Sequence, residues 1–105
     1  MFTRFKYKIT FIHYQKTLMK LNMKIEIYTT ENCPYCRKAK LIFDSLSVDY
    51  NEIDVENEEQ RQCMKSRAKG NYTVPQIFIG EDYIGGYDEL KKLKDLGKLS
   101  KMLIE

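Results

Sequence analysis

Two cysteines three positions apart, Cys33 and Cys36, are the residues whose type and spacing indicate chemistry most directly. An alternating apolar run ends just before them and a helical apolar pattern begins just after them, so the pair lies where a predicted strand meets a predicted helix. Pro34 fits the first position of that helix, where its missing N–H costs nothing. Helical spacing brings the two cysteines close enough for a disulfide of ordinary geometry. The motif therefore predicts thiol–disulfide exchange.

The predicted place of Cys33 at a helix N-terminus makes it the more reactive cysteine of the pair. Unpaired backbone N–H groups and the positive end of the helix dipole favour a thiolate there. Arg37, Lys38 and Lys40 follow closely, and cations in a first turn oppose the dipole. We interpret their positive charges as stabilising a thiolate or an anionic ligand near the start of the helix. Cys36, one turn further on, is less favoured as a thiolate and suits the role of a resolving thiol.

Composition indicates one domain, because 105 residues can bury a core of two or three layers but not two such cores. The content of 43% hydrophobic and 31% charged residues is ordinary for a soluble globular protein. No run approaches the roughly 20 apolar residues of a membrane span, so no membrane partner is expected. Three cysteines are an odd number, which argues against a fully paired extracellular framework and favours the cytoplasm.

The positive charge is concentrated at the N-terminus. Residues 1–22 contain five Lys or Arg and no acid, so the remainder carries 13 basic and 15 acidic side chains, a net charge of −2. That remainder predicts no nucleic-acid partner. We expect residues 1–22 to be a poorly ordered basic extension and residues 23–105 to be the domain, with a targeting segment or an added element as alternatives for the extension. His13, the single histidine, lies in the extension and is interpreted as a surface residue.

From residue 23 onward, strand patterns and helix patterns alternate. The strand–helix–strand unit at the start predicts two parallel strands with a crossover, and the turn at residues 80–82 predicts an antiparallel hairpin. Asn57 fits the N-cap of the second helix. Strands are predicted at 24–29, 49–55, 73–79 and 83–84, and helices at 34–47, 58–69, 88–96 and, as a short last helix, around 99–103.

Two of these elements have ambiguous patterns. In the second strand, Val48 and Tyr50 fall on the opposite parity from Ile53 and Val55, which predicts a bulge or a boundary error. The second helix has a thin apolar stripe, in which Cys63 is interpreted as a small half-buried residue, with a regulatory or glutathionylated thiol as the alternative. The first helix has a fuller stripe, made of Tyr35, Ala39, Ile42, Phe43 and Leu46.

Four motifs in one register resemble the glutaredoxin family, in its short bacterial dithiol type, over about residues 23–105. They are Ile25-Glu26-Ile27-Tyr28-Thr29, Cys33-Pro34-Tyr35-Cys36, Thr73-Val74-Pro75-Gln76-Ile77-Phe78-Ile79 and Ile84-Gly85-Gly86-Tyr87-Asp88-Glu89-Leu90. The resemblance implies an α/β, thioredoxin-like fold with a four-stranded mixed sheet flanked by three to four helices. It also implies reduction of protein disulfides and glutathione mixed disulfides at the expense of glutathione, by a monomer without a metal.

The resemblance assigns roles residue by residue. Cys33 resembles the family's nucleophile and Cys36 its resolving thiol. Val74 resembles the residue before the family's cis-proline, here Pro75, and the backbone of such a residue pairs with bound glutathione like a short strand. Further contacts with glutathione are implied at Tyr35, Arg37 and Thr73.

A second group of implied contacts lies near the start of the predicted helix 88–96. Gly86 lets the backbone approach a ligand closely. The N–H groups of Tyr87 and Asp88 resemble the site for the γ-glutamyl carboxylate at a helix N-terminus, and the carboxylate of Asp88 would meet the ligand's amine. The second helix is expected to add one contact, from Arg61 or Gln62. Thr30 stands where many relatives have a lysine, a loss for which Arg37 or Lys69 could compensate.

Three other readings of the cysteine pair are weaker. An iron–sulfur protein would use Cys33 and glutathione across a dimer, but Pro34 stiffens the turn and disfavours this alternative. A zinc site would need all three cysteines and His13, and the chain has no second CxxC. A thioredoxin proper is disfavoured because the chain has no tryptophan and no Gly-Pro pair between its cysteines.

Overall fold

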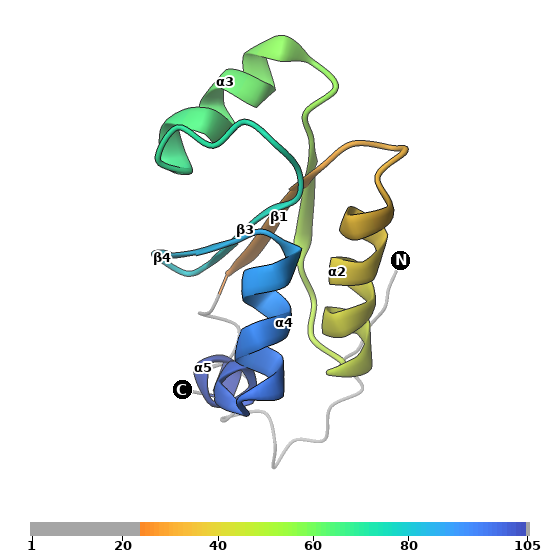
Figure 1. Cartoon of the computed structure of the whole chain (residues 1–105), viewed down its shortest axis with the longest axis vertical. Coiled ribbons are helices and arrows are strands. Elements are labelled where there is room, and N and C mark those ends of the chain that lie inside the picture. The colour runs from red at the N-terminus through yellow and green to blue at the C-terminus, as the bar shows by residue number, and fades with distance from the viewer. Residues whose placement is uncertain (1–23, 105) are drawn as a thin grey trace, which may run out of the picture.

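The computed structural model describes residues 24–104, in which a four-stranded mixed sheet carries helices on both faces (Figure 1). The predicted sheet and its flanking helices are confirmed. The extension predicted for residues 1–22, with His13, lies outside the described residues. The elements are β1 (Ile25–Thr29), α2 (Pro34–Ser45), β2 (Asn51–Asp54), α3 (Glu58–Arg67), β3 (Gln76–Ile79), β4 (Asp82–Gly85), α4 (Tyr87–Asp95) and α5 (Lys98–Ile104).

The sheet has the strand order β2-β1-β3-β4. β1 and β2 run parallel and are joined by α2, as the strand–helix–strand pattern predicts. β3 pairs antiparallel with β1 on one side and with β4 on the other. β1 therefore occupies the centre of the sheet, and its carboxyl end leads directly into the turn that carries the cysteines.

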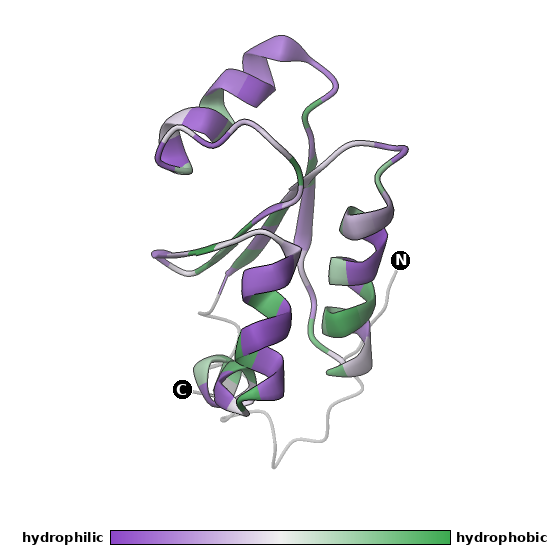
Figure 2. Ribbon diagram, in the orientation of Figure 1, coloured by the Kyte–Doolittle hydropathy of each residue, from purple (hydrophilic) through white to green (hydrophobic). Residues whose placement is uncertain are grey.

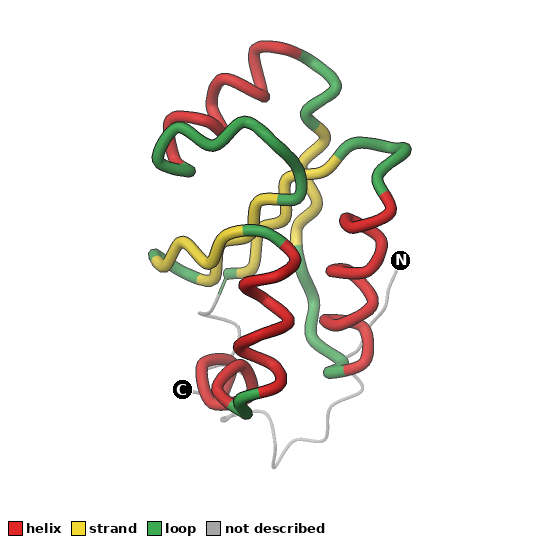
Figure 3. Tube along the Cα trace, in the orientation of Figure 1, coloured by secondary structure: helices red, strands yellow, loops and turns green. Residues whose placement is uncertain are grey.

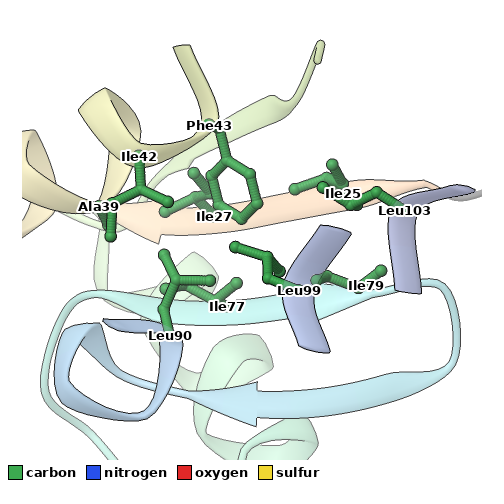
Figure 4. Packing of buried hydrophobic residues seen from close by; sticks show 10 residues of the cluster. All are labelled: Ile25, Ile27, Ala39, Ile42, Phe43, Ile77, Ile79, Leu90, Leu99 and Leu103. Atoms are coloured by element: carbon green, nitrogen blue, oxygen red, sulfur yellow. The ribbon is translucent and has the colours of Figure 1, made fainter. Parts of the chain in front are cut away.

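One face of the sheet packs against α2, α4 and α5 (Figure 4). Phe43 on α2 is fully buried, and its ring centroid lies 6.0 Å from that of Tyr50. Phe43 belongs to a cluster of buried apolar residues that fixes α2, and with it the cysteine pair, to the sheet. Its buried members are Ile25, Ile27, Ala39, Ile42, Phe43, Ile77, Ile79, Leu90, Leu99 and Leu103.

The other face packs against α3, which Figure 1 shows set apart from the other helices. Asn57 caps α3 as predicted, accepting from the N–H of Gln60 at 3.0 Å. Only Met64 is buried within α3, and Figure 2 shows its ribbon as mostly hydrophilic. The guanidinium of Arg67 covers the ring of Phe78 at 4.0 Å and donates to the hydroxyl of Tyr28 at 2.8 Å. The thin apolar stripe of α3 is thus not its only contact with the sheet, because Arg67 at the end of the helix also packs against it.

Two predicted strands are shorter in the structure. β2 begins at Asn51 and pairs with β1 without a register shift, so the parity change reflects a boundary error and no bulge. Val48 and Tyr50 precede β2 and pack on the α2 face, whereas Ile53 and Val55 pack on the α3 face. β3 begins at Gln76 instead of residue 73, because the proline before it has no N–H to donate to a ladder.

Two side chains are more exposed than predicted. Tyr35, placed in the apolar stripe of α2, is 54% exposed, and its ring lies beside that of Tyr87. Cys63 is exposed instead of half-buried, since α3 turns only Met64 and its neighbour Ala68 toward the sheet. Helix ends agree more closely, and α2 and α3 each end two residues earlier than predicted. No helix between residues 24 and 104 is long and apolar enough to cross a bilayer.

Candidate active site

Cys33 is the N-cap of α2, and Pro34 follows at the first helical position, as predicted. The sulfur of Cys33 occupies the place of a capping oxygen and accepts the N–H of Cys36 at 3.1 Å. The first turn contains no acidic side chain. The sulfur thus accepts a backbone hydrogen bond at the positive end of the helix dipole.

Cys36 has a different environment, although it lies one turn away. It is 1% exposed, whereas Cys33 is 7% exposed. Burial, together with the side-chain hydrogen bond to Cys33, raises the pKa of Cys36 to about 12. A hydrogen bond from the backbone of Thr30 and the charge of Lys40 act in the opposite direction but are smaller. Cys36 is therefore a protonated thiol at neutral pH, in line with the prediction that it is the less favoured thiolate of the pair. Both cysteines are free.

A loop from the far side of the sheet lies against Cys33. The Val74–Pro75 peptide bond is cis, as the resemblance implies, and the segment precedes β3. The carbonyl oxygen of Val74 lies 3.9 Å from the sulfur of Cys33. Residues that are 41 positions apart in the sequence thus meet at the N-terminus of α2.

A groove of about 530 Å³ runs beside this meeting point. Its walls come from the loop before β3, from Gln76 at the start of β3, from β4 and from the first turn of α4, with one residue from α2. It brings together most of the predicted ligand contacts, namely Tyr35, Thr73, Val74, Pro75, Gly86, Tyr87 and Asp88.

Three predicted contacts do not line this groove. Arg37 lies exposed on the first turn of α2. Gln62 donates to a carboxylate oxygen of Glu58 at 2.7 Å, and the guanidinium of Arg61 stacks on the ring of Tyr72 at 5.0 Å. Arg61 and Gln62 belong to α3, which packs on the opposite face of the sheet from α4.

The glycine pair brings the start of α4 close to the proline loop. Gly85 has a φ of +117°, and a Cβ built there would lie 3.0 Å from the side chain of Glu89. The N–H of Gly86 donates to that carboxylate at 2.8 Å, and a Cβ at Gly86 would approach the carbonyl of Pro75 to 3.4 Å. Glycine is therefore needed at position 85, whereas a Cβ at position 86 would reach contact distance. The first turn of α4, whose N–H groups have no partner within the helix, lines the groove.

Two features were missed by reasoning from the sequence. The ring centroids of Tyr35 and Tyr87 lie 5.7 Å apart, and the ammonium of Lys38 lies 5.1 Å and 5.9 Å from them. Helical spacing could have placed Lys38 next to Tyr35, but Tyr87 is 52 residues further along the chain. The second feature is a group of hydrogen bonds around Gln76, the one polar residue of β3.

A mixed sheet, a CxxC pair at the N-terminus of the helix after β1, and a cis-proline facing the first cysteine define a dithiol protein of the thioredoxin fold. The sequence model of the glutaredoxin family matches residues 25–84, and the chain belongs to that family. It is therefore a thiol–disulfide oxidoreductase, and the recognition made from the four motifs is confirmed.

Individual relatives agree with this assignment. The chain is 44% identical over 81 residues to glutaredoxin 1 of Rickettsia typhi, covering 75% of this chain and 78% of the relative. The solution structure of a glutaredoxin from Brucella melitensis superposes with a TM-score of 0.68 at 43% identity, covering 77% of this chain and 88% of the other. A buckwheat glutaredoxin–glutathione complex gives a TM-score of 0.69 at 28% identity, covering 90% and 94%.

Proposed function

We propose that this protein is a glutathione-dependent oxidoreductase that reduces protein disulfides and glutathione mixed disulfides through Cys33 and Cys36. The observation that carries the proposal is the sulfur of Cys33 at the N-cap of α2, 3.9 Å from the Val74 carbonyl that forms part of the groove wall. A thiolate at this point can attack a disulfide held in the groove. The solved relative described as a glutaredoxin–glutathione complex supports glutathione as the occupant.

The reaction begins with the thiolate of Cys33 attacking the glutathione sulfur of a mixed disulfide. The old S–S bond breaks, the substrate leaves as a thiolate that takes up a proton, and glutathione becomes bonded to Cys33. A second glutathione, as thiolate, attacks the glutathione sulfur of that bond. It releases oxidised glutathione and restores the thiolate of Cys33, so one free glutathione thiol is consumed for each mixed disulfide reduced, and the other half of the oxidised glutathione comes from the substrate.

Protein disulfides need the second cysteine. Attack by Cys33 leaves one substrate sulfur bonded to the enzyme and the other free as a thiol. Cys36 loses its proton to solvent and attacks Cys33, which releases the second substrate thiol and forms the Cys33–Cys36 disulfide. Two glutathione molecules then reduce this disulfide. Because burial raises the pKa of Cys36, we expect its deprotonation to slow this branch at neutral pH.

In the proposed complex, glutathione lies along the groove as an added strand. The backbone of Val74 pairs with its cysteine residue, next to Thr73 and Pro75. The N–H groups of Tyr87 and Asp88, at the N-terminus of α4, receive the γ-glutamyl carboxylate, with Gly86 allowing close approach. Asp88 pairs with the amine. Tyr35 covers the sulfur end, and Arg37 and either Arg61 or Gln62 are placed near the glycine carboxylate.

We propose that the protein acts as a monomer in the cytoplasm. Net charge and residue distribution give the main domain no feature suited to nucleic acid. The alternative of an iron–sulfur dimer is not adopted, because no feature of the described residues favours it over disulfide exchange.

The proposal is tested by reduction of hydroxyethyl disulfide, with glutathione, glutathione reductase and NADPH, on chains that start at Met1 and at Met23. We expect both chains to turn over at the same rate, since the described site lies entirely after residue 23. Turnover that is supported by thioredoxin reductase but not by glutathione would refute the proposal.

Asp88→Asn is expected to raise the KM for a glutathionylated substrate about tenfold, which corresponds to about 1.4 kcal/mol. The change removes the charge that faces the ligand's amine but keeps the shape of the side chain. The matched control is Asp95→Asn on the same helix, where the carboxylate pairs with Lys91 at 2.8 Å and does not line the groove. Equal KM values for the two variants would contradict the assigned role of Asp88.

A further inference from the structure

Gln76 is a buried polar residue whose hydrogen bonds are not explained by the chemistry above. It is 3% exposed and opens β3, in which the three other residues are apolar and buried. Its amide nitrogen donates to the carbonyl oxygen of Thr73 at 2.9 Å and lies 3.4 Å from the hydroxyl of Thr73. Its amide oxygen accepts the hydroxyl hydrogen of Tyr83 on β4 at 2.5 Å.

The chain of bonds continues to the surface. The side-chain nitrogen of Asn71 donates to the hydroxyl oxygen of Tyr83 at 2.8 Å. Tyr83 is thus donor to Gln76 and acceptor from Asn71, so its hydroxyl hydrogen has a defined direction. Asn71, Tyr83 and Gln76 connect the two ends of the loop before β3 with the neighbouring strand. We call these three residues, all of which also line the groove, the Gln76 relay.

The relay bonds to the segment of residues 73–75, which no strand pairing holds in place. Thr73, Val74 and Pro75 precede the first residue of β3, and Figure 3 shows them as part of a long loop. The β1–β3 ladder begins at Gln76 and therefore does not hold this segment. The hydrogen bond from Gln76 ties the Thr73 carbonyl in place. The next carbonyl, that of Val74, lies 3.9 Å from the sulfur of Cys33.

A buried amide is costly unless it is bonded, and an apolar side chain would fill this position in β3 without that cost. A structural role in core packing therefore does not explain the residue type. The amide does explain how the carbonyl of Thr73, next to Val74 in the chain, is held in place. Ring packing is separate from this effect, because the ring of Tyr83 contacts Phe78 with centroids 5.0 Å apart, independently of its hydroxyl.

We propose that the Gln76 relay positions the Thr73–Val74 backbone for its ligand, so that Gln76 and Tyr83 are positioning residues for the reaction. The inference rests on the proposed function, in which glutathione pairs with Val74. Loosening the relay lets the segment move in the free protein, and the ligand must then order it on binding. The attacking sulfur is held separately by α2. The effect therefore falls on KM and leaves kcat nearly unchanged.

The test compares Tyr83→Phe with Tyr28→Phe. Both variants lose one hydroxyl on the α3 face of the sheet, and that of Tyr28 bonds Arg67 away from the groove. We expect Tyr83→Phe to raise the KM for a glutathionylated peptide about three- to tenfold, the cost of one lost hydrogen bond, with kcat within about twofold. Tyr28→Phe should lose similar thermal stability with no change in KM. Equal KM values in the two variants would overturn the proposal.

A second comparison separates positioning from direct contact with the ligand. Gln76→Met removes both relay bonds with little change in volume, and we expect the Gln76→Met/Tyr83→Phe double variant to have the KM of Gln76→Met alone. If the increases in KM of the two single variants multiplied in the double variant, the two residues would contact the ligand independently, and the proposal would be overturned. NMR relaxation of the free protein supplies a readout that does not depend on glutathione. Order parameters of Thr73 and Val74 should fall in Tyr83→Phe and not in Tyr28→Phe, and unchanged values would overturn the proposal.

The proposed function and the proposal about the Gln76 relay would be refuted by different results. A wild-type protein without glutathione-coupled turnover would refute the proposed function, and the order parameters would still decide whether the relay holds the loop. A wild-type protein with that turnover, together with variants that match it in KM and in loop order, would refute the relay alone.

Discussion

Cys33→Ser is expected to lose all measurable turnover of disulfide substrates, whereas Cys36→Ser keeps reduction of small glutathione mixed disulfides within about tenfold of the wild type. The first change removes the sulfur that attacks. The second removes only the resolving thiol, which a second glutathione replaces. Reduction of a protein disulfide should fall in both variants, because only Cys36 releases that substrate intramolecularly. Coupled assays with a glutathionylated peptide and with a protein disulfide measure the two branches.

The third cysteine supplies a matched control for these changes. Cys63 is free and exposed on α3, so Cys63→Ser should leave both branches at the wild-type rate. Residual activity in Cys33→Ser, or loss of mixed-disulfide reduction in Cys36→Ser alone, would contradict the assigned roles.

Phe43→Ala is expected to lower the free energy of unfolding by about 3–5 kcal/mol, the usual cost of deleting a buried phenylalanine side chain. Phe43 is fully buried between α2 and the sheet, and the cavity left behind would loosen the helix that carries the cysteines. Urea unfolding followed by circular dichroism measures the change.

Leu41→Ala on the same helix is the control for this loss. Leu41 is 63% exposed, so its truncation should cost at most about 0.5 kcal/mol. Similar losses for the two variants would mean that α2 is not fixed to the sheet through Phe43.

Local signals were sufficient for the elements that hold the cysteines. The alternation of Ile25 and Ile27, the proline at the first helical position and the spacing of Ala39, Ile42 and Phe43 are short-range patterns, and all are borne out by the burial of these side chains. The position of Asn57 at the N-cap of α3 is equally local. The hairpin of β3 and β4 followed from the turn residues between two apolar runs.

Other features depend on which face of the sheet a residue meets. Tyr35 is correctly spaced for the core stripe, but its ring is half exposed and lies beside that of Tyr87 instead. Cys63 lies next to Met64, and periodicity with so few apolar residues could not choose between them. Tertiary packing decides both cases.

The candidate site likewise contains some features that local sequence predicts and others that only tertiary packing decides. The cysteine motif and the glycine pair could be found from the sequence, because their conformational requirements are local. The Gln76 relay could not, since it joins residues on a loop and two strands, and only the register of β3 and β4 shows that Tyr83 reaches Gln76. Which residue of α3 faces the ligand was left open, and Arg61 and Gln62 are both engaged by neighbouring side chains.

The central claim is that Cys33, at the N-cap of α2, is the attacking sulfur, while burial keeps Cys36 a protonated thiol. Alkylation of the reduced protein by iodoacetamide across a series of pH values, with each site quantified by mass spectrometry, tests this most directly. We predict that Cys33 is modified faster than Cys36 at neutral pH, where burial leaves Cys36 largely unmodified. Modification of both cysteines at the same rate at neutral pH, or of Cys36 before Cys33, would contradict the account.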